Sequence, residues 1–266
     1  MTIPINEAAS TPLPSLAGKR GLIVGIANEQ SIAYGCAQVI RQLGGAIAVT
    51  YMNAKAEPHV RPLAEQLGAE IIAPLDVEQP GQMEAVFAQI QQHWGHLDFL
   101  LHAIAYAPAA DLHGRVVDSS AAGFARAMDI SCHSFVRMAR MAEPLMKGGG
   151  ALVTMSYYGA QKVVANYGIM GPVKAALEAT VLYLAAELGP AGIRVHAVSP
   201  GPIKTRAASG IGEFEKLLDD TASRAPDHQL VTIADVGAVT ALLCSDAARA
   251  MTGNVVFVDA GYHVMG

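Results

Sequence analysis

The sequence predicts an α/β fold in which helices cover both faces of a doubly wound parallel sheet. Short runs of apolar and β-branched residues recur along the chain from Lys19 onward, and each run is followed by a stretch of helical character. The runs are apolar throughout rather than alternating, which is typical of strands buried on both faces. A chain of 266 residues commonly forms one domain when it contains an open α/β sheet.

Seven apolar runs predict the strands of this sheet. KRGLIVG, AIAVTY, EIIAPL, DFLLHAI, ALVTMS, IRVHAVS and VVFVD predict strands over 19–25, 46–51, 70–75, 98–104, 151–156, 193–199 and 255–259. Helices are predicted between these strands over 31–43, 57–67, 121–146 and 233–244. Two further helices are predicted, one through residues 85 and 90 and one that carries Tyr167 and Lys174. Regular crossovers of this kind indicate a Rossmann-type sheet, whose ligands bind beyond the carboxyl ends of the strands.

The domain organisation is predicted to be simple. Residues 1–15, which carry prolines and serines, are expected to form a flexible tail, and residues 16–266 to form a single domain. A segment near 205–226 contains glycines and mixed charges. It is expected to cover the substrate as a mobile lid, although an ordinary surface excursion explains it nearly as well.

Composition excludes several classes of partner. A formal net charge of −5 without a basic cluster argues against nucleic acid, whose binding requires Lys and Arg to neutralise phosphates. No apolar run approaches the roughly 20 residues of a membrane span, and the start of the chain lacks a signal peptide. With 52% hydrophobic and 15% charged residues, the polar surface is thin, which favours an oligomer.

Cysteine and histidine patterns argue against a metal site. The three cysteines, Cys36, Cys132 and Cys244, lie far apart and form no CxxC, which fits a reducing compartment and hence a cytoplasmic protein. The nine histidines show no HExxH or comparable spacing, so no metal is expected.

A dinucleotide site is predicted at the ends of the strands. Gly25 supplies a tight turn after the first strand, and Ser31 begins the next helix, whose N-terminus would bind a pyrophosphate. The GxGxxG spacing is absent, so an ordinary loop with a serine N-cap is an equal alternative. Asp76 and Val77 follow the third strand, where the carboxylate would accept from an adenine amino group or simply form a turn.

Further strand ends carry suitable residues. Ile104 and Ala105 end the fourth strand, where small residues let the backbone approach a ribose, and 200–205 would hold a nicotinamide amide after the sixth. The residue after the second strand should choose between NAD and NADP. This chain has Tyr51, Met52 and Asn53 there, which leaves the choice open.

Tyr167 and Lys174 form the candidate catalytic pair. Seven residues separate them, about two helical turns, which would place them on one helix face. The ammonium is expected to lower the pKa of the phenol, which would donate to a developing oxyanion. A half-buried tyrosine and a solvated lysine are the common alternative. Gly168 and Pro172 predict that the helix starts late or is distorted.

A competing pair, Tyr158 and Lys162, has the Tyr-x-x-x-Lys spacing of ordinary short-chain dehydrogenases, but it lies in the turn after the fifth strand. Four residues before Lys174 stands Met170, which cannot donate a proton. Tyr167 is therefore the phenol that this helix offers, and Tyr158 and Lys162 are interpreted as a coincidence.

Three motifs give the chain a family resemblance. Gly25 to Gly35 with SIAYG, then SYYGAQKVVANYGIMGPVKAALEA and GPIKTRAASGIGEF resemble the NADH-dependent enoyl-acyl carrier protein reductases, a divergent branch of the short-chain dehydrogenases. The resemblance runs from Leu16 to about Gly261. It implies reduction of trans-2-enoyl thioesters in fatty acid biosynthesis, an acyl carrier protein as partner, and a homotetramer.

The resemblance also implies site roles. Tyr167 would bond the substrate carbonyl, Lys174 the nicotinamide ribose, and Tyr157 would be the second active-site tyrosine, although Tyr158 beside it leaves that assignment open. Ala107 would contact the acyl thioester. The dinucleotide contacts implied by the family are Gly25, Ser31, Ile32, Met52, Asp76, Val77, Ile104, Ile203 and Thr205. The resemblance implies NADH as the cofactor. Met52 stands where better-known members carry glutamine near the adenosine ribose, which weakens the preference for NADH over NADPH.

Two other functions share the predicted fold. A carbonyl reductase of the same superfamily would need a proton donor four residues before the lysine, where this chain has Met170. A catalytically silent NAD(P)-sensing protein would keep the dinucleotide site without using the Tyr167 and Lys174 pair.

Overall fold

A computed structural model describes residues 13–205 and 212–265 of the chain. Its centre is a seven-stranded sheet in the order β3-β2-β1-β4-β5-β6-β7, and every neighbouring pair is parallel. The strands are β1 (Arg20–Val24), β2 (Ala46–Tyr51), β3 (Ile71–Pro74), β4 (Phe99–His102), β5 (Gly150–Met155), β6 (Ile193–Pro200) and β7 (Asn254–Val258). The predicted fold class and all seven predicted strands are confirmed.

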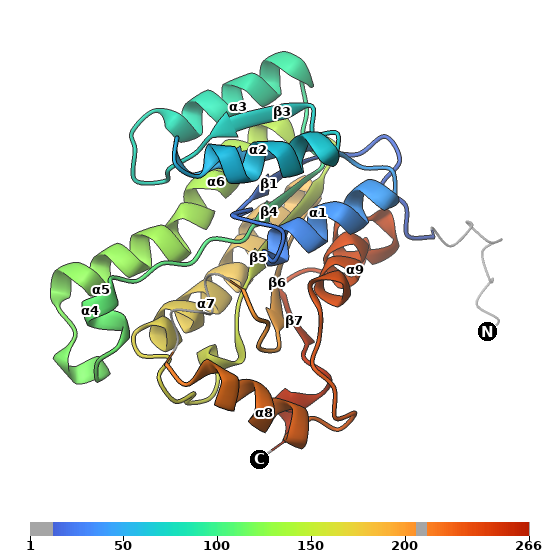
Figure 1. The fold of residues 1–266 in the computed structure, drawn as a ribbon. Helices are drawn as coiled ribbons and strands as arrows, with labels where there is room; N and C mark the ends of the chain where they lie inside the picture. Colours follow the sequence, from blue (N-terminus) through green and yellow to red (C-terminus); the bar gives the residue numbers. More distant parts are fainter. Residues whose placement is uncertain (1–12, 206–211, 266) are drawn as a thin grey trace, which may run out of the picture.

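Helices cover both faces of the sheet, as Figure 1 shows. One hydrophobic cluster packs α1 (Ile32–Gln42), α2 (Glu57–Gln66) and α9 (Ile233–Cys244) on one face. A second cluster packs α3 (Gln82–His93), α6 (Ser134–Ala142) and α7 (Met170–Leu188) on the other. Because the strands are apolar on both sides, each face needs such a cover, and this explains the long hydrophobic runs of the sequence. None of the helices among the described residues is long and apolar enough to span a bilayer.

The remaining helical segments lie outside these two layers. They are α4 (Ala109–Leu112), α5 (Ala121–Met128), α8 (Phe214–Arg224), the π-helical turn η2 (Asp129–His133), and the short 3-10 turns η1 (Val116–Asp118), η3 (Glu143–Leu145), η4 (Tyr158–Ala160), η5 (Gly189–Ala191), η7 (Asp246–Ala248) and η8 (Tyr262–Val264). In Figure 1, α8 lies beyond the end of the sheet and close to the C-terminus. The predicted lid, 205–226, contains α8, while its residues 206–211 and most of the predicted tail fall outside the described residues.

Two predicted helices differ from the structure. The region expected to be helical over 121–146 is helical from Ala121 to Leu145, but a π turn and a final 3-10 turn replace the α pattern between and after α5 and α6. The helix after β5 begins only at Met170, so Tyr167 precedes it. The predicted late start is confirmed, and the expectation that Tyr167 and Lys174 share one helix face is wrong. Gly168, with a φ of 53°, continues a turn that most side chains avoid.

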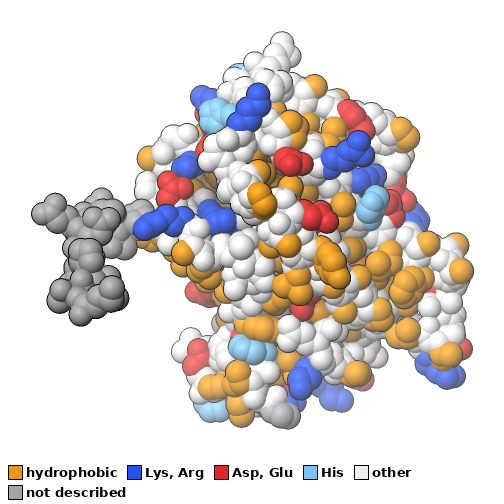
Figure 2. Space-filling view, turned by 180° about the vertical axis from the view of Figure 1, so that it is seen from behind, with side chains coloured by type: hydrophobic (Ala, Val, Ile, Leu, Met, Phe, Trp, Pro, Cys, Tyr) orange, Lys and Arg blue, Asp and Glu red, His pale blue; other side chains and the backbone are white. Residues whose placement is uncertain are grey.

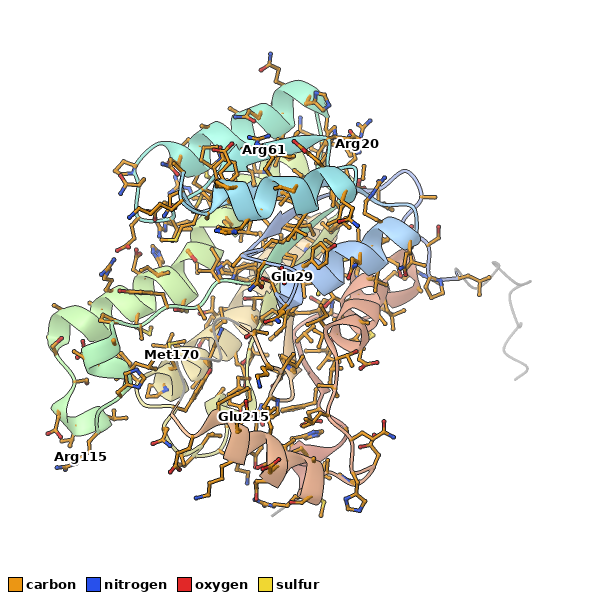
Figure 3. The ribbon with its side chains drawn as sticks, in the orientation of Figure 1. Arg20, Glu29, Arg61, Arg115, Met170 and Glu215 are labelled. Atoms are coloured by element: carbon orange, nitrogen blue, oxygen red, sulfur yellow. The ribbon has the colours of Figure 1, made fainter. Side chains whose placement is uncertain are left out.

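The order of the strands defines where a ligand would bind. The chain runs outward from β1 to β3 on one side, then returns to β4 beside β1 and continues to β7. Between β1 and β4 the helices change face, which opens a crevice at the carboxyl ends of these strands. In Figure 3, Glu29 marks the loop after β1, Met170 the start of α7 and Glu215 helix α8 around this end of the sheet.

Candidate active site

The turn after β1 requires glycine at its first position. Gly25 has a φ of 116°, and a Cβ on it would lie 2.2 Å from the carbonyl oxygen of Ala103, the residue after β4. A side chain would therefore force the two strand ends apart at the crevice. The conformation brings the backbone of the β1–α1 loop against the neighbouring strand end, as a dinucleotide site requires.

Ser31 occupies the N-cap position of α1 without capping it. Its hydroxyl instead accepts the backbone N–H groups of Ala27 at 3.0 Å and Asn28 at 3.1 Å. The side chain therefore shapes the loop and leaves the first turn of α1 without a side-chain cap. An uncapped helix N-terminus after a tight glycine turn fits a pyrophosphate, so the alternative of a capping serine is not what the structure shows.

Asp76 follows β3 and forms a turn. Its Oδ1 atom accepts the backbone N–H of Glu78 at 3.0 Å, and its own N–H donates to Gln82 Oε1 at 2.7 Å. Val77 is buried, and its carbonyl oxygen accepts from the Arg137 guanidinium at 3.0 Å. These contacts fix both residues at the edge where an adenine ring would lie, and they also account for the turn role that the sequence left open.

Four further predicted cofactor residues occupy the same edge of the sheet. Met52, directly after β2, exposes 55% of its surface. Ile104 is partly buried after β4 and Ile203 after β6, each packed against one of the two core clusters. Thr205 lies two residues further on and is also partly buried. The structure therefore brings the predicted set to one edge of the sheet.

A third hydrophobic cluster gathers the predicted substrate residues. Tyr167 packs there with Val173 of α7, and Ala107 and Tyr157 pack against them from the loops after β4 and β5. The rings of Tyr157 and Tyr167 meet edge to face with centroids 4.9 Å apart. The Tyr157 hydroxyl is buried and finds no hydrogen-bond partner among residues 13–205 and 212–265. A buried polar atom without a partner is costly, which points to a bound polar ligand at this place.

Tyr158 lies in a different environment from Tyr157. Its ring meets Tyr262 edge to face at 5.5 Å, and Tyr262 donates a hydrogen bond to Asp220 of α8 at 2.9 Å. Lys162, the other half of the competing pair, is exposed. Tyr157, rather than Tyr158, is thus the tyrosine beside Tyr167, and Tyr158 connects the loop after β5 to α8.

Lys174 is buried rather than solvated. It exposes 4% of its surface, and its Nζ atom donates to the carbonyl oxygen of Met155, the last residue of β5, at 2.6 Å. Burial lowers its pKa to about 8, and the nearby Cys132 and Glu178 oppose this shift. An ammonium has three N–H donors, so this lysine can bind a ligand while it keeps its bond to β5.

The expectation that Lys174 lowers the pKa of Tyr167 is wrong. Burial raises the pKa of the Tyr167 phenol, and the neighbouring Tyr157 and Glu178 raise it further. Tyr167 exposes only 8% of its surface, so the loss of hydration dominates over any distant charge. The phenol therefore stays protonated and acts as a hydrogen-bond donor rather than as an ionised group.

A buried polar network at the ends of β4 and β5 was not predicted from the sequence. The His102 ring contacts Thr154 Oγ1 through Nδ1 and Ser134 Oγ through Nε2, both at 2.8 Å. Because Ser134 donates its own proton to the Ile130 carbonyl oxygen at 2.6 Å, it must accept from Nε2, and Nδ1 is the acceptor. Burial, together with the charge of Lys174, lowers the pKa of His102 to about 3.

Glu178 is a second residue that sequence reasoning missed. It is buried one helical turn after Lys174 on α7, where its carboxylate accepts from the Ser156 hydroxyl at 2.6 Å and the Gln161 amide at 3.0 Å. These bonds join α7 to the loop after β5, which carries Tyr157. The spacing of Lys174 and Glu178, four residues apart on a helix, was the available signal. No group of three or more His, Cys, Asp or Glu side chains that could hold a metal occurs in the described part of the chain.

The fold and these contacts define a class of protein: a dinucleotide-dependent oxidoreductase of the short-chain dehydrogenase type, with a buried tyrosine and lysine at the end of β5. The sequence profile described as enoyl-(acyl carrier protein) reductase matches residues 25–263. The chain therefore belongs to the enoyl-acyl carrier protein reductase family.

Individual relatives agree with this assignment. The NADH-dependent enoyl-[acyl-carrier-protein] reductase of Rickettsia felis is 45% identical over 251 residues, which cover 94% of this chain and 96% of the relative. The crystal structure of the enzyme from Aquifex aeolicus is 47% identical, covers 94% of this chain and 99% of its own, and superposes with a TM-score of 0.91. A Bacillus cereus enoyl-acyl carrier protein reductase, solved with NADP+ and an indole naphthyridinone, is 41% identical, covers 96% of this chain and 100% of its own, and has a TM-score of 0.93.

Proposed function

We propose that this protein reduces the double bond of trans-2-enoyl thioesters with NADH, the reaction of its family in fatty acid biosynthesis. The observation that carries the proposal is the third hydrophobic cluster, which holds Tyr157, Tyr167 and Ala107 together. Lys174 is anchored beside this cluster at the end of β5. Apolar surroundings with a protonated phenol suit an acyl chain whose carbonyl must accept negative charge.

The turn at Gly25 and the uncapped start of α1 would hold the pyrophosphate of the cofactor, and Asp76, Val77 and Met52 would flank its adenosine half. Ile104, Ile203 and Thr205 would lie along the nicotinamide half, with Lys174 on the ribose hydroxyls. When bound, NADH would supply a hydride for the β-carbon of the substrate, and a proton added at the α-carbon would complete the reduction. The names of the relatives favour NADH, and the exposed Met52 offers no charge that would select a 2′-phosphate.

Tyr167 would stabilise the charge that develops on the thioester oxygen. Because its pKa is raised by burial, the phenol keeps its proton and donates a hydrogen bond to the enolate oxygen. This bond strengthens as the oxygen gains charge, so it favours the transition state over the ground state. A donor of this kind is typically worth about 3–4 kcal/mol.

Lys174 would contribute position and charge. Its bond to the Met155 carbonyl oxygen fixes the ammonium at the end of β5, where it can hold the ribose and so orient the cofactor toward Tyr167. Its positive charge also favours the negative charge that forms on the substrate oxygen. Holding the reactants in one geometry is the other large contribution to the rate.

The substrate is proposed to arrive on an acyl carrier protein, and the chain is proposed to act as a homotetramer in the cytoplasm. Helix α7 exposes Leu182 and Tyr183, by 55% and 73%, and Figure 2 shows hydrophobic side chains gathered across the middle of one face. A second copy of the chain would cover such a surface. Light scattering of the purified protein tests this point, and a monomer at assay concentration would contradict it.

The segment near 205–226 is proposed to cover the acyl chain, with residues 16–266 acting as one domain. Helix α8 is joined to the loop after β5 through Tyr158 and Tyr262, and Lys204 pairs with Glu215 across the same segment. These contacts support the proposal by joining α8 to the loop after β5, and Figure 3 shows Glu215 on this helix.

One assay tests the proposed function against its alternatives. Oxidation of NADH and of NADPH is followed with a crotonyl thioester and, separately, with simple ketones. Consumption with the thioester supports the proposal, and faster consumption of NADH supports the cofactor assignment. Consumption with ketones alone would identify a carbonyl reductase, and none with either substrate would identify a nucleotide-sensing protein.

A further inference from the structure

One buried side chain, Ser131, holds the loop after β4 at Tyr106. The Ser131 hydroxyl accepts the backbone N–H of Tyr106 at 2.9 Å and donates to the carbonyl oxygen of the same residue at 3.0 Å. Ser131 itself is completely buried. Both polar groups of the Tyr106 backbone are thus bound by one side chain, which defines its position and its peptide orientation.

Ser131 lies in the π turn that joins α5 to α6. Within η2 the backbone N–H of Ser134 bonds to the carbonyl oxygen of Asp129, five residues back, so one extra residue is inserted between α5 and α6. The insertion changes the phase of the helix. Ser131 and Ser134, three residues apart, bond to the end of β4 and the loop that follows it: Ser131 to Tyr106 and Ser134 to His102. Residues three apart also share one face of a continuous α-helix, so the spacing of the two serines accounts for their common direction.

The side chain of Tyr106 is held independently of its backbone. The guanidinium of Arg126 lies 4.8 Å from the centroid of the Tyr106 ring and donates to its hydroxyl at 3.2 Å. Arg126 is in turn fixed by two 2.7 Å bonds to the carboxylate of Glu78, in the loop after β3. Bidentate arginine–carboxylate pairs define geometry well, so the ring and the backbone of Tyr106 are both restrained.

The restrained residue lies between two positions assigned to ligands. Ile104 precedes it on the cofactor side, and Ala107 follows it in the cluster that contains Tyr167. We propose that Ser131 is a positioning residue for the reduction: by binding Tyr106 it sets the place of Ala107 against the thioester. This inference rests on the proposed function, in which Ala107 contacts the thioester.

The test replaces Ser131 by alanine, which removes one oxygen atom and leaves the backbone of Tyr106 unheld. KM for a crotonyl thioester is expected to rise about tenfold, because Ala107 would no longer be held where it contacts the thioester and that binding contact would weaken. The dissociation constant of NADH is expected to stay within about twofold, since Lys174 and the Gly25 turn are untouched. Hydrogen exchange at the Tyr106 amide is expected to speed up in the variant and to be slow in the wild-type enzyme.

Thr252→Val serves as the matched control. The Thr252 hydroxyl accepts the backbone N–H of Val195 at 3.0 Å, near the amino-terminal end of β6 and therefore at the opposite edge of the sheet. If S131A and T252V lower the melting temperature equally but only S131A raises KM, the positioning role stands. If KM changes equally in both, or if S131A weakens NADH instead, the proposal is overturned.

Two measurements keep the proposal testable if S131A does not fold. The wild-type Tyr106 amide must exchange more slowly than the Ala107 amide beside it, and equal rates would overturn the proposal without any variant. Ser131→Cys, which keeps a weaker donor and acceptor, is expected to give a smaller rise in KM. A failure of the proposed function would be recognised separately, because the wild-type enzyme would then leave the thioester unreduced.

Discussion

The ammonium of Lys174 lies 2.6 Å from the carbonyl oxygen of Met155, so α7 is tied to the end of β5 before any ligand binds. This contact converts a residue that would ordinarily be solvated into a buried, oriented charge. Burial of the ammonium also lowers the pKa of Lys174 to about 8. Several properties of the enzyme should depend on it.

Replacing Lys174 by methionine is expected to weaken NADH binding roughly ten- to a hundredfold, because a hydrogen bond from a charged group is worth about 1.5–3 kcal/mol. Methionine keeps an unbranched chain of similar length, so packing changes little. Fluorescence titration with NADH measures the effect. Lys162→Met, at the exposed lysine of the competing pair, is the control and should bind NADH normally. An unaltered dissociation constant in K174M would remove the lysine from the cofactor site.

The affinity for NADH is expected to fall as the pH rises above about 8. The pKa of Lys174 is lowered to about 8 in the folded protein, so the ammonium is charged below this pH and neutral above it. Titrations between pH 7 and pH 9 should show weaker binding at the alkaline end in the wild-type enzyme. K174M has no such group, and its dissociation constant should be flat over the same range. A decline of equal size in both proteins would show that another group titrates.

Replacing Tyr167 by phenylalanine is expected to lower kcat by about one to three decades while NADH binding barely changes, because one donor to the developing oxyanion is lost. The ring still fills the third hydrophobic cluster, so stability should be kept. Steady-state turnover of a crotonyl thioester measures the loss. Tyr158→Phe is the control, since this ring contacts Tyr262 and not Tyr167. Unchanged turnover in Y167F would move the catalytic role to Tyr157.

Replacing Tyr157 by phenylalanine is expected to raise the free energy of unfolding by about 1 kcal/mol, because a buried hydroxyl without a partner is removed. The hydroxyl is unpaired among the described residues, and the edge-to-face contact with Tyr167 survives the substitution. Urea unfolding in the absence of ligands measures this. The same variant should bind the thioester less tightly, if the hydroxyl meets the substrate. A loss of stability would show that the hydroxyl has a partner in the free enzyme.

The sequence predicts all of the strands of the sheet but only part of the geometry of the site. Each strand carries its own signal, since a continuous apolar run identifies it locally. Gly25, Asp76 and Ile104 could be placed for the same reason, because the ends of parallel strands share one edge. The geometry between Tyr167 and Lys174 was misjudged, since the helix begins at Met170 and burial, not the lysine, sets the pKa of the phenol.

Other features depend on contacts between distant parts of the chain. His102, Thr154 and Ser134 come from β4, β5 and the start of α6, and nothing in the spacing of these residues indicates that they meet. The π turn at Asp129–His133 likewise leaves no mark in a hydrophobic pattern, because it shifts the helix by one residue inside an otherwise helical stretch. Tertiary packing decides both, and it lies beyond the reach of local periodicity.

The His102 network predicts how stability depends on pH. The pKa of His102 is lowered from 6.5 to about 3 and that of His196 to about 4, in both cases mainly by burial. Above pH 6.5 both histidines are neutral in the folded and unfolded chains, and stability is complete. As the pH falls below 6.5, the two histidines bind protons in the unfolded chain but stay neutral in the folded protein. Stability should therefore fall by about 1.4 kcal/mol per pH unit for each histidine.

Urea unfolding at constant protein concentration, between pH 7 and pH 4.5, tests this dependence. His102→Gln is expected to be less stable at pH 7, because the bonds to Thr154 and Ser134 change, yet to lose stability about half as steeply on acidification, since only His196 then contributes. His59→Gln, at an exposed position, is the control and should follow the wild-type slope. An equal slope in H102Q and the wild type would mean that the pKa of His102 is the same in the folded and unfolded chains. That result would contradict a buried, neutral imidazole that joins β4 to β5 and α6.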